Sequence, residues 1–189
     1  MERLGYLATF VSLIYGLGVA NVLAHVASLI KRGREADWYW VHTLWTFYLL
    51  LLMATFWWLL QIWATVPRIG FLNYLSLLVI PSLLFVASDL LFPERSTEGR
   101  VDLKAHFFKV KRPLLGVVFL VLVSDEIDTL QKGWSHLVEL GPIYWGSQLY
   151  WYLATIIGIR SDREWVHGAI VVVGVGIFVV TAINALAFV

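Results

Sequence analysis

Cysteine is absent from this sequence, and charged residues are scarce. None of the 189 residues is cysteine, which excludes disulfides, thiolate catalysis, Fe–S clusters and cysteine-type zinc sites. Lys, Arg, Asp and Glu make up only 14% of the chain, where soluble domains carry about a quarter. Apolar residues make up 60%, and the mean hydropathy is +0.78. This composition predicts an integral membrane protein with a single transmembrane domain over residues 1–189, and it excludes nucleic-acid-binding and soluble-enzyme classes.

The motifs of common enzymes and pores are also missing. The sequence holds no phosphate-binding P-loop, no Gly-x-Ser-x-Gly nucleophile elbow and no zinc-protease His-Glu pair. It also lacks a potassium-channel filter and the regular arginine series of a voltage sensor. No pattern predicts a cofactor or a metal site. We therefore favour a protein that is not an enzyme; a membrane enzyme acting on a lipid would require the cytoplasmic His and Asp residues to converge on one substrate.

Six apolar segments are long enough, or nearly so, to cross a bilayer, since about 20 helical residues span a hydrocarbon core roughly 30 Å thick. We expect an all-α bundle of six transmembrane helices with short loops, at residues 4–30, 38–63, 71–91, 113–130, 142–159 and 165–188.

Residues 101–112 precede the fourth predicted span and have an amphipathic pattern. Helical spacing places Leu103 and Phe107 on one face and Lys104, Lys111 and Arg112 away from it. This pattern predicts a short helix on the cytoplasmic surface, held there by anionic lipid. Pro113, which follows, suits the first turn of the next span.

Lysine and arginine alternate between the loops. The segments 31–35, 93–112 and 160–164 hold eleven of these residues, and the other three stretches outside the spans hold one each. Because basic loops stay in the cytoplasm, both termini are predicted to lie outside, which would be the periplasm of a bacterium. The lipid bilayer is the expected partner. Tryptophans cluster at both ends of the second span, as headgroup anchors do: Trp38, Trp40, Trp45, Trp57, Trp58 and Trp63.

Small residues recur at every fourth position of the first span: Ala8, Ser12, Gly16, Ala20, Ala24 and Ser28. Such a row lets helix backbones approach closely in lipid. It predicts a packing seam against a neighbouring helix or another subunit, and it favours a homo-oligomer.

Two histidines face each other across the first predicted hairpin. His25 and His42 both lie about nine residues from the centre of the first loop, so they are expected at one depth in the bundle. Asn21 and Thr46 lie one helical turn further along. The four residues could form a hydrogen-bonded tie between helices or a proton-accepting site, because histidine titrates near neutral pH. A metal site would need a further ligand, and no motif supplies one.

The fourth predicted span contains acidic residues after only a short apolar stretch. Only ten apolar residues, 114–123, precede Ser124, Asp125, Glu126 and Asp128, and ten residues cover about half a bilayer. Asp125 and Asp128 share a helical face with Lys132, while Glu126 points about 100° away. Either this is a solvated helix end with a surface ion pair, or the carboxylates lie in a cavity below the outer surface.

Several amides are expected at the same outer level: Gln61, Asn73, Gln148 and Asn184. With Asp125 and Asp128 they could line an outward-facing vestibule, and Tyr144, Gln148 and Trp151 share one face of the fifth span. We therefore expect a small channel or carrier for a cation, proton or small solute, with His25, His42 and Asn21 on its inner side. The alternative is a non-catalytic membrane subunit that self-associates or packs on a larger complex through the row of small residues.

Overall fold

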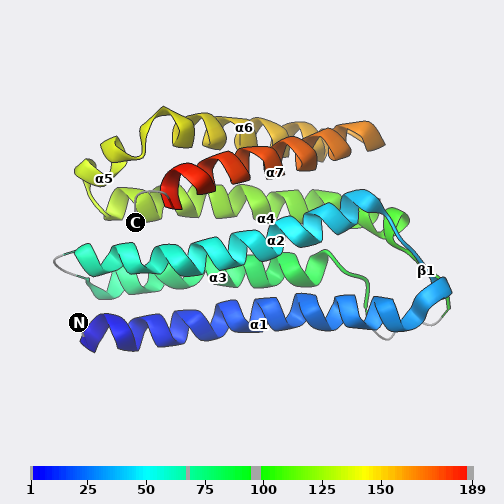
Figure 1. The fold of residues 1–189 in the computed structure, drawn as a ribbon, viewed down its shortest axis with the longest axis horizontal. Helices are drawn as coiled ribbons and strands as arrows, with labels where there is room; N and C mark the ends of the chain where they lie inside the picture. The colour runs from blue at the N-terminus through cyan, green and yellow to red at the C-terminus, as the bar shows by residue number, and fades with distance from the viewer. Residues whose placement is uncertain (1, 67–68, 95–98, 187–189) are drawn as a thin grey trace.

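The computed structural model describes residues 2–66, 69–94 and 99–186, and these residues fold as a bundle of long helices (Figure 1). The helices are α1 (Glu2–Arg32), α2 (Trp40–Leu59), α3 (Phe71–Leu90), α4 (Leu103–Gln131), α5 (Trp134–Glu139), α6 (Gly141–Arg160) and α7 (Glu164–Leu186). Two 3₁₀ turns, η1 (Gly33–Glu35) and η2 (Leu60–Thr65), and two short strands, β1 (Ala36–Asp37) and β2 (Val101–Asp102), complete it. The predicted all-α class is confirmed.

The six long helices lie roughly side by side and alternate in direction along the chain (Figure 1). Helix α3 packs against both α1 and α4, α4 packs against α6, and α2 packs against α7. The start of α1 and the end of α7 lie at one end of the bundle with α5, which we call the α5 end. The opposite end carries β1, β2 and the α6–α7 connection, and we call it the basic end.

Within the described residues, four helical segments have the length and hydropathy needed to cross a membrane: Ala8–Glu35, Trp40–Thr65, Phe71–Leu90 and Glu164–Thr181. They correspond to four of the six predicted spans. Helices α4 and α6 are long enough to cross a membrane, but they are not apolar enough to be among these four segments. Helix α4 carries charged residues toward both of its ends, and polar and glycine residues reduce the hydropathy of α6.

The prediction of a separate surface helix at 101–112 is wrong. Helix α4 runs without interruption from Leu103 to Gln131, and Pro113 lies inside it. Asp102 caps its start, where the carboxylate accepts hydrogen bonds of 2.9 Å from two backbone N–H groups. Phe107 is fully buried, and Lys111 is only 2% exposed. The apolar face of this segment therefore packs inside the bundle rather than on lipid.

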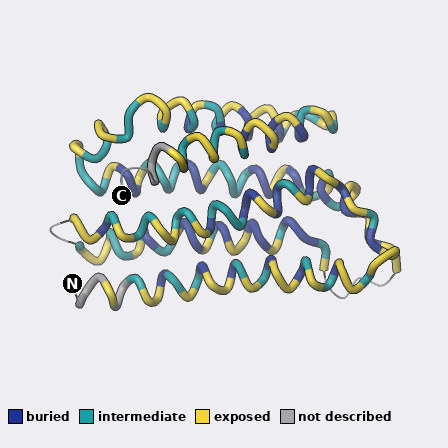
Figure 2. The backbone as a smooth tube through the Cα atoms, in the orientation of Figure 1, coloured by how far each residue is buried: buried dark blue, intermediate teal, exposed yellow. Residues whose placement is uncertain are grey.

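Buried residues line the inner faces of the helices, and exposed residues cover the outer faces (Figure 2). The core is rich in large side chains, among them Trp45, Tyr48 and Trp151. The outer faces are also apolar, with Leu13, Leu17 and many other large hydrophobic side chains exposed. An apolar exterior of this extent is costly in water and suits a bilayer.

Candidate functional site

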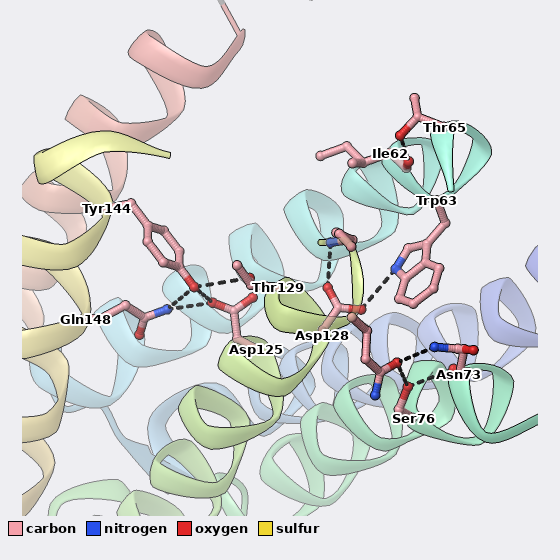
Figure 3. A network of polar contacts seen from close by, with 12 residues as sticks. Ile62, Trp63, Thr65, Asn73, Ser76, Asp125, Asp128, Thr129, Tyr144 and Gln148 are labelled. Atoms are coloured by element: carbon pink, nitrogen blue, oxygen red, sulfur yellow. Dashed lines mark hydrogen bonds and ion pairs between the residues drawn. The ribbon is translucent and has the colours of Figure 1, made fainter. Parts of the chain in front are cut away.

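The last two turns of α4 carry a network of polar contacts at the α5 end (Figure 3). Asp125, Asp128 and Thr129 share the inward face because their spacing of three and four residues matches one helical turn. Partners come from η2, from the start of α3 and from the start of α6. The network divides into three groups, centred on Asp125, Asp128 and Gln131.

Asp125 is held by neutral donors from α6. Tyr144 donates its hydroxyl proton to Oδ2 of Asp125 at 2.8 Å, and Gln148 donates from Nε2 to the same oxygen at 2.5 Å. The hydroxyls of Thr129 and Tyr144 lie 3.3 Å apart. None of the ion pairs among the described residues includes Asp125. The Oε1 atom of Gln148, a residue only 6% exposed, is buried without a hydrogen-bond partner.

Asp128, one turn further along α4, has a different environment. Its Oδ2 lies 2.5 Å from Nζ of Lys132, and its Oδ1 accepts a 2.9 Å hydrogen bond from Nε1 of Trp63. The side chains of Lys132 and Asp128 are only 7% and 11% exposed. The Lys132 ammonium also lies 5.8 Å from the centre of the Trp63 ring. Lys132 therefore neutralises the charge of Asp128, and the hydrogen bond from Trp63 ties α4 to η2.

The expected vestibule of amides does not form as one group. Asn73 and Ser76 both donate to Oε1 of Gln131, at 3.1 and 2.8 Å, so they join α3 to α4. Gln61 is exposed, and the side chain of Asn184 lies outside the described residues.

Glu126 lies apart from the cavity and from the polar network described above. Its carboxylate is beside the hydroxyl of Tyr152 on α6. It follows Asp125 directly on α4, so the helical turn of about 100° per residue points it in a different direction.

A cavity of about 60 Å³ lies inside the bundle between α2, α3, α4 and α6. Among the described residues, Asp125 is the one charged residue that lines it. Trp45, Tyr48 and Trp151 form an aromatic part of the wall, and the rest is almost wholly aliphatic. The expected polar and aromatic face of the fifth span thus contributes Trp151 to the cavity and Gln148 to the Asp125 group.

Sequence reasoning missed some members of this site. Trp45 and Trp63 had been assigned to the headgroup region, but they are 3% and 1% exposed, and they contact the cavity and Asp128 respectively. Thr129 and Gln131 were also missed. The spacing of four residues between Asp125 and Thr129 was the sequence signal that could have identified Thr129. No local pattern identifies Trp63, because its partner Asp128 is 65 residues away.

His25 and His42 lie at one level, on two sides of Phe92. The His25 ring stacks on Phe92 with centroids 4.9 Å apart, and His42 meets the same ring edge-on at 5.1 Å. Nε2 of His42 donates to the carbonyl oxygen of Leu91 at 2.9 Å, while its Nδ1 is buried without a partner. Neither histidine lines the cavity.

The other two members of the expected histidine group bond elsewhere. Asn21 donates to the hydroxyl of Ser88 on α3 at 3.1 Å. Thr46 donates to the backbone carbonyl of His42, one turn earlier on α2, at 2.9 Å. Asn21 therefore ties α1 to α3, and Thr46 makes only a local bond. The structure places the two histidines on either side of Phe92.

The row of small residues on α1 faces outward. Gly16, Ala20 and Ala24 are exposed, and the intermediate positions are Ala8, Ser12 and Ser28. The buried face of α1 is a different one, formed by residues such as Tyr15 and Val22. Within this chain the row contacts a neighbouring helix at Ser12, which accepts a 2.9 Å hydrogen bond from Trp57 on α2. A seam against another subunit stays a prediction.

Ion pairs fasten the connections at the basic end. Arg100 donates two hydrogen bonds to Asp37, at 2.5 and 2.6 Å, beside the parallel pair β1–β2. These bonds hold the pKa of the Asp37 carboxyl below its usual range. Lys104 pairs with Glu164 at 2.5 Å and so joins α4 to α7.

The buried Lys111 makes a further connection at the basic end. Its ammonium pairs with Asp162 at 2.6 Å and donates to the carbonyl of Ser161. The hydrogen bond from Lys111 holds the pKa of Asp162 below its usual range. Lys111, predicted to lie away from the apolar face on a lipid-facing surface, instead holds the α6–α7 connection.

Known proteins give no independent guide to the activity. Within the described residues, no group of three or more His, Asp or Glu side chains could hold a metal ion. Neither the protein-family models, nor the curated proteins, nor the solved structures yield a match to this chain.

Proposed function

We propose that this chain is a six-span membrane protein that moves a proton or a small monovalent cation through the bundle, and that Asp125 is the group that binds it. One observation carries the proposal. The Asp125 carboxylate borders a cavity inside the bundle and joins no ion pair among the described residues, whereas Asp128 is paired with Lys132.

Helices α4 and α6 complete the set of six spans in this proposal. Helix α4 has 29 residues and α6 has 20, which correspond to lengths of about 43 and 30 Å, enough to cross a hydrocarbon core. Helix α4 packs between α3 and α6, so lipid does not have to solvate its polar face. The concentration of basic residues at one end of the bundle supports a cytoplasmic basic end with both termini outside.

The charge at Asp125 indicates the kind of solute. An ionised carboxylate inside a membrane is costly unless another charge balances it. Tyr144 and Gln148 stabilise the carboxylate by hydrogen bonds, but they carry no charge. One proton or one monovalent cation balances the single negative charge. A solute that binds Asp125 therefore removes the cost of the buried charge.

The histidine pair is not needed for this function. His42 engages the Leu91 carbonyl, and the cavity lining excludes both His25 and His42. We assign them to packing around Phe92. Self-association through the outward row on α1 remains compatible with transport, and it is the basis of the alternative function as a membrane subunit.

Flux measurements in liposomes test the proposal. The purified protein is reconstituted, and a pH-sensitive dye and a cation-sensitive dye report movement down an imposed gradient. We expect wild-type flux above that of empty liposomes and its loss in Asp125→Asn. Glu126→Gln is the matched control, because it removes the same charge from the adjacent residue, away from the cavity, and should retain the flux.

Two results would contradict the proposal. Wild-type liposomes as tight as empty ones would remove the transport function. Flux that Asp125→Asn leaves unchanged would remove Asp125 from the pathway.

A further inference from the structure

We infer that the cavity beside Asp125 binds ammonium or a small primary ammonium ion such as methylammonium. This inference rests on the proposed function only in taking Asp125 as the binding group. It adds the chemical class of the solute, which follows from the charge, the wall and the size of the cavity.

The wall of the cavity offers aromatic surface beside the carboxylate. Tyr48 and Trp151 stack with ring centroids 4.9 Å apart, and Trp45 meets each of them edge-on with centroids 6.0 Å away. All three residues line the cavity together with Asp125. Aromatic rings attract cations through their electron-rich faces, most strongly where water is excluded. A carboxylate combined with such a wall is suited to an organic ammonium ion.

The same wall is poorly suited to a metal cation. Hard metal ions need about six oxygen ligands to replace their hydration shell. The cavity lining provides the Asp125 carboxylate, while most of the other lining residues are aliphatic or aromatic. An ammonium ion needs fewer oxygen contacts, since it donates hydrogen bonds to the carboxylate and turns its remaining surface toward the rings.

A second acceptor lies next to Asp125. Oε1 of Gln148 is buried and has no hydrogen-bond partner, and Nε2 of the same amide contacts Asp125 at 2.5 Å. Buried acceptors without a partner are rare because each one costs free energy. Gln148 is not among the described residues that line the cavity, so the proposed ion site rests on Asp125 and the aromatic wall.

The volume limits the size of the ion. A protein cavity of about 150 Å³ holds benzene, which has six heavy atoms. By proportion, the cavity of about 60 Å³ holds about two or three heavy atoms. Methylammonium has two, whereas tetramethylammonium has five and is too large.

Direct binding measurements on the wild-type protein test this inference. The full chain in lipid nanodiscs is titrated with methylammonium chloride, sodium chloride and tetramethylammonium chloride, and heat release and tryptophan fluorescence are recorded. We expect methylammonium to bind at least about tenfold more tightly than sodium, with no saturable binding of tetramethylammonium. Equal affinity for sodium, binding of tetramethylammonium as tight as that of methylammonium, or no binding of methylammonium would overturn the inference.

Variants identify which groups recognise the ion. Asp125→Asn should abolish methylammonium binding. Tyr48→Leu removes an aromatic ring and should weaken binding about tenfold, whereas Tyr48→Phe keeps the ring and should bind within about twofold of wild type. Equal affinity of folded Tyr48→Leu and Tyr48→Phe would show that the aromatic wall is not used.

The inference and the proposed function fail in different ways. Proton flux that depends on Asp125, without any binding of methylammonium, leaves the proposed function intact and removes the ammonium site. Methylammonium binding that depends on Asp125 in a protein without flux keeps the site and removes transport.

Discussion

Replacing Lys132 by methionine tests whether Asp128 belongs to a buried ion pair. Methionine keeps much of the length and apolar volume of the lysine stem but removes the charge. Asp128 would then keep the hydrogen bond from Trp63 and lose the only cation paired with it among the described residues. A buried carboxylate without a counter-charge is strongly destabilising.

The structure sets the size of the expected effect. Exposed ion pairs contribute at most about 1 kcal/mol, whereas removing one member of a buried pair costs about 3–5 kcal/mol. Because the Lys132 and Asp128 side chains are 7% and 11% exposed and Trp63 still donates to the carboxylate, we expect the lower end, about 3 kcal/mol. For a chain of this length, that loss reduces the melting temperature by about 6–12 °C.

The reciprocal substitution should cost less. Asp128→Asn keeps an oxygen that can accept from Trp63, and the long Lys132 side chain can turn its charge toward the surface. We expect a loss of about 1 kcal/mol for this variant. The double variant Asp128→Asn with Lys132→Met removes both charges, so it should recover most of the stability lost in Lys132→Met alone.

Thermal unfolding in one detergent at a fixed scan rate measures these effects, because unfolding of membrane proteins is often irreversible. Lys109→Met is the matched control, because Lys109 lies on the same helix and is exposed. The melting temperature of this variant should stay near that of the wild-type protein. The reasoning is refuted if Lys132→Met melts within about 1 °C of wild type, or if the single and double variants are additive.

Two further predictions concern packing and topology. A Cβ atom at Gly174 would lie 2.4 Å from the Trp151 ring, so Gly174→Ala should destabilise the protein by about 1–3 kcal/mol in the same melting assay. Gly176→Ala, where a Cβ meets nothing within 4 Å, should melt at or above the wild-type temperature; equal losses would refute the packing argument. The chain has no cysteine, so Ser135→Cys and Arg163→Cys each supply a single thiol. In intact cells a membrane-impermeant maleimide should label position 135 and leave position 163 unlabelled, and the opposite pattern would reverse the proposed topology.

The helices could be predicted from the sequence because hydropathy and helical periodicity are local properties. The burial of residues 103–112 inside the bundle could not be predicted, because an amphipathic sequence pattern is the same whether its apolar face contacts lipid or other helices. Phe107 and Phe108 pack against His167, which lies about 60 residues further along the chain. The buried Lys111 is likewise explained only by its ion pair with Asp162 on the α6–α7 connection.

The sequence predicted the two carboxylates of the candidate site on α4, but it did not predict every partner of each carboxylate. The position of the acidic residues in the fourth predicted span left two alternatives open, a solvated helix end or an enclosed cavity, while the shared face of Asp125 and Asp128 follows from helical spacing. Their different environments depend on distant partners. Tyr144 reaches Asp125 from α6, and Trp63 reaches Asp128 from η2. No local pattern distinguishes Asp128, which pairs with Lys132, from Asp125, which is in none of the ion pairs among the described residues.

The sequence Trp-Val-His lies in the first turn of both α2 and α7, and its two histidines make the same kind of hydrogen bond. His42 and His167 are each 1% exposed, and each donates from Nε2 at 2.9 Å to a backbone carbonyl just beyond the end of a helix. The acceptors are Leu91, after α3, and Ser161, after α6.

Such carbonyls have no partner within their own helix, so a ring N–H that binds one fastens the helix end to its neighbour. A protonated imidazole would place a charge in surroundings formed largely by phenylalanine rings, at a high desolvation cost. Both histidines therefore suit a permanent neutral tie better than a proton relay. Among the titratable side chains discussed here, Asp125 is the one that borders the cavity and is in no ion pair among the described residues, so any transfer of a cation through this bundle should depend on it first.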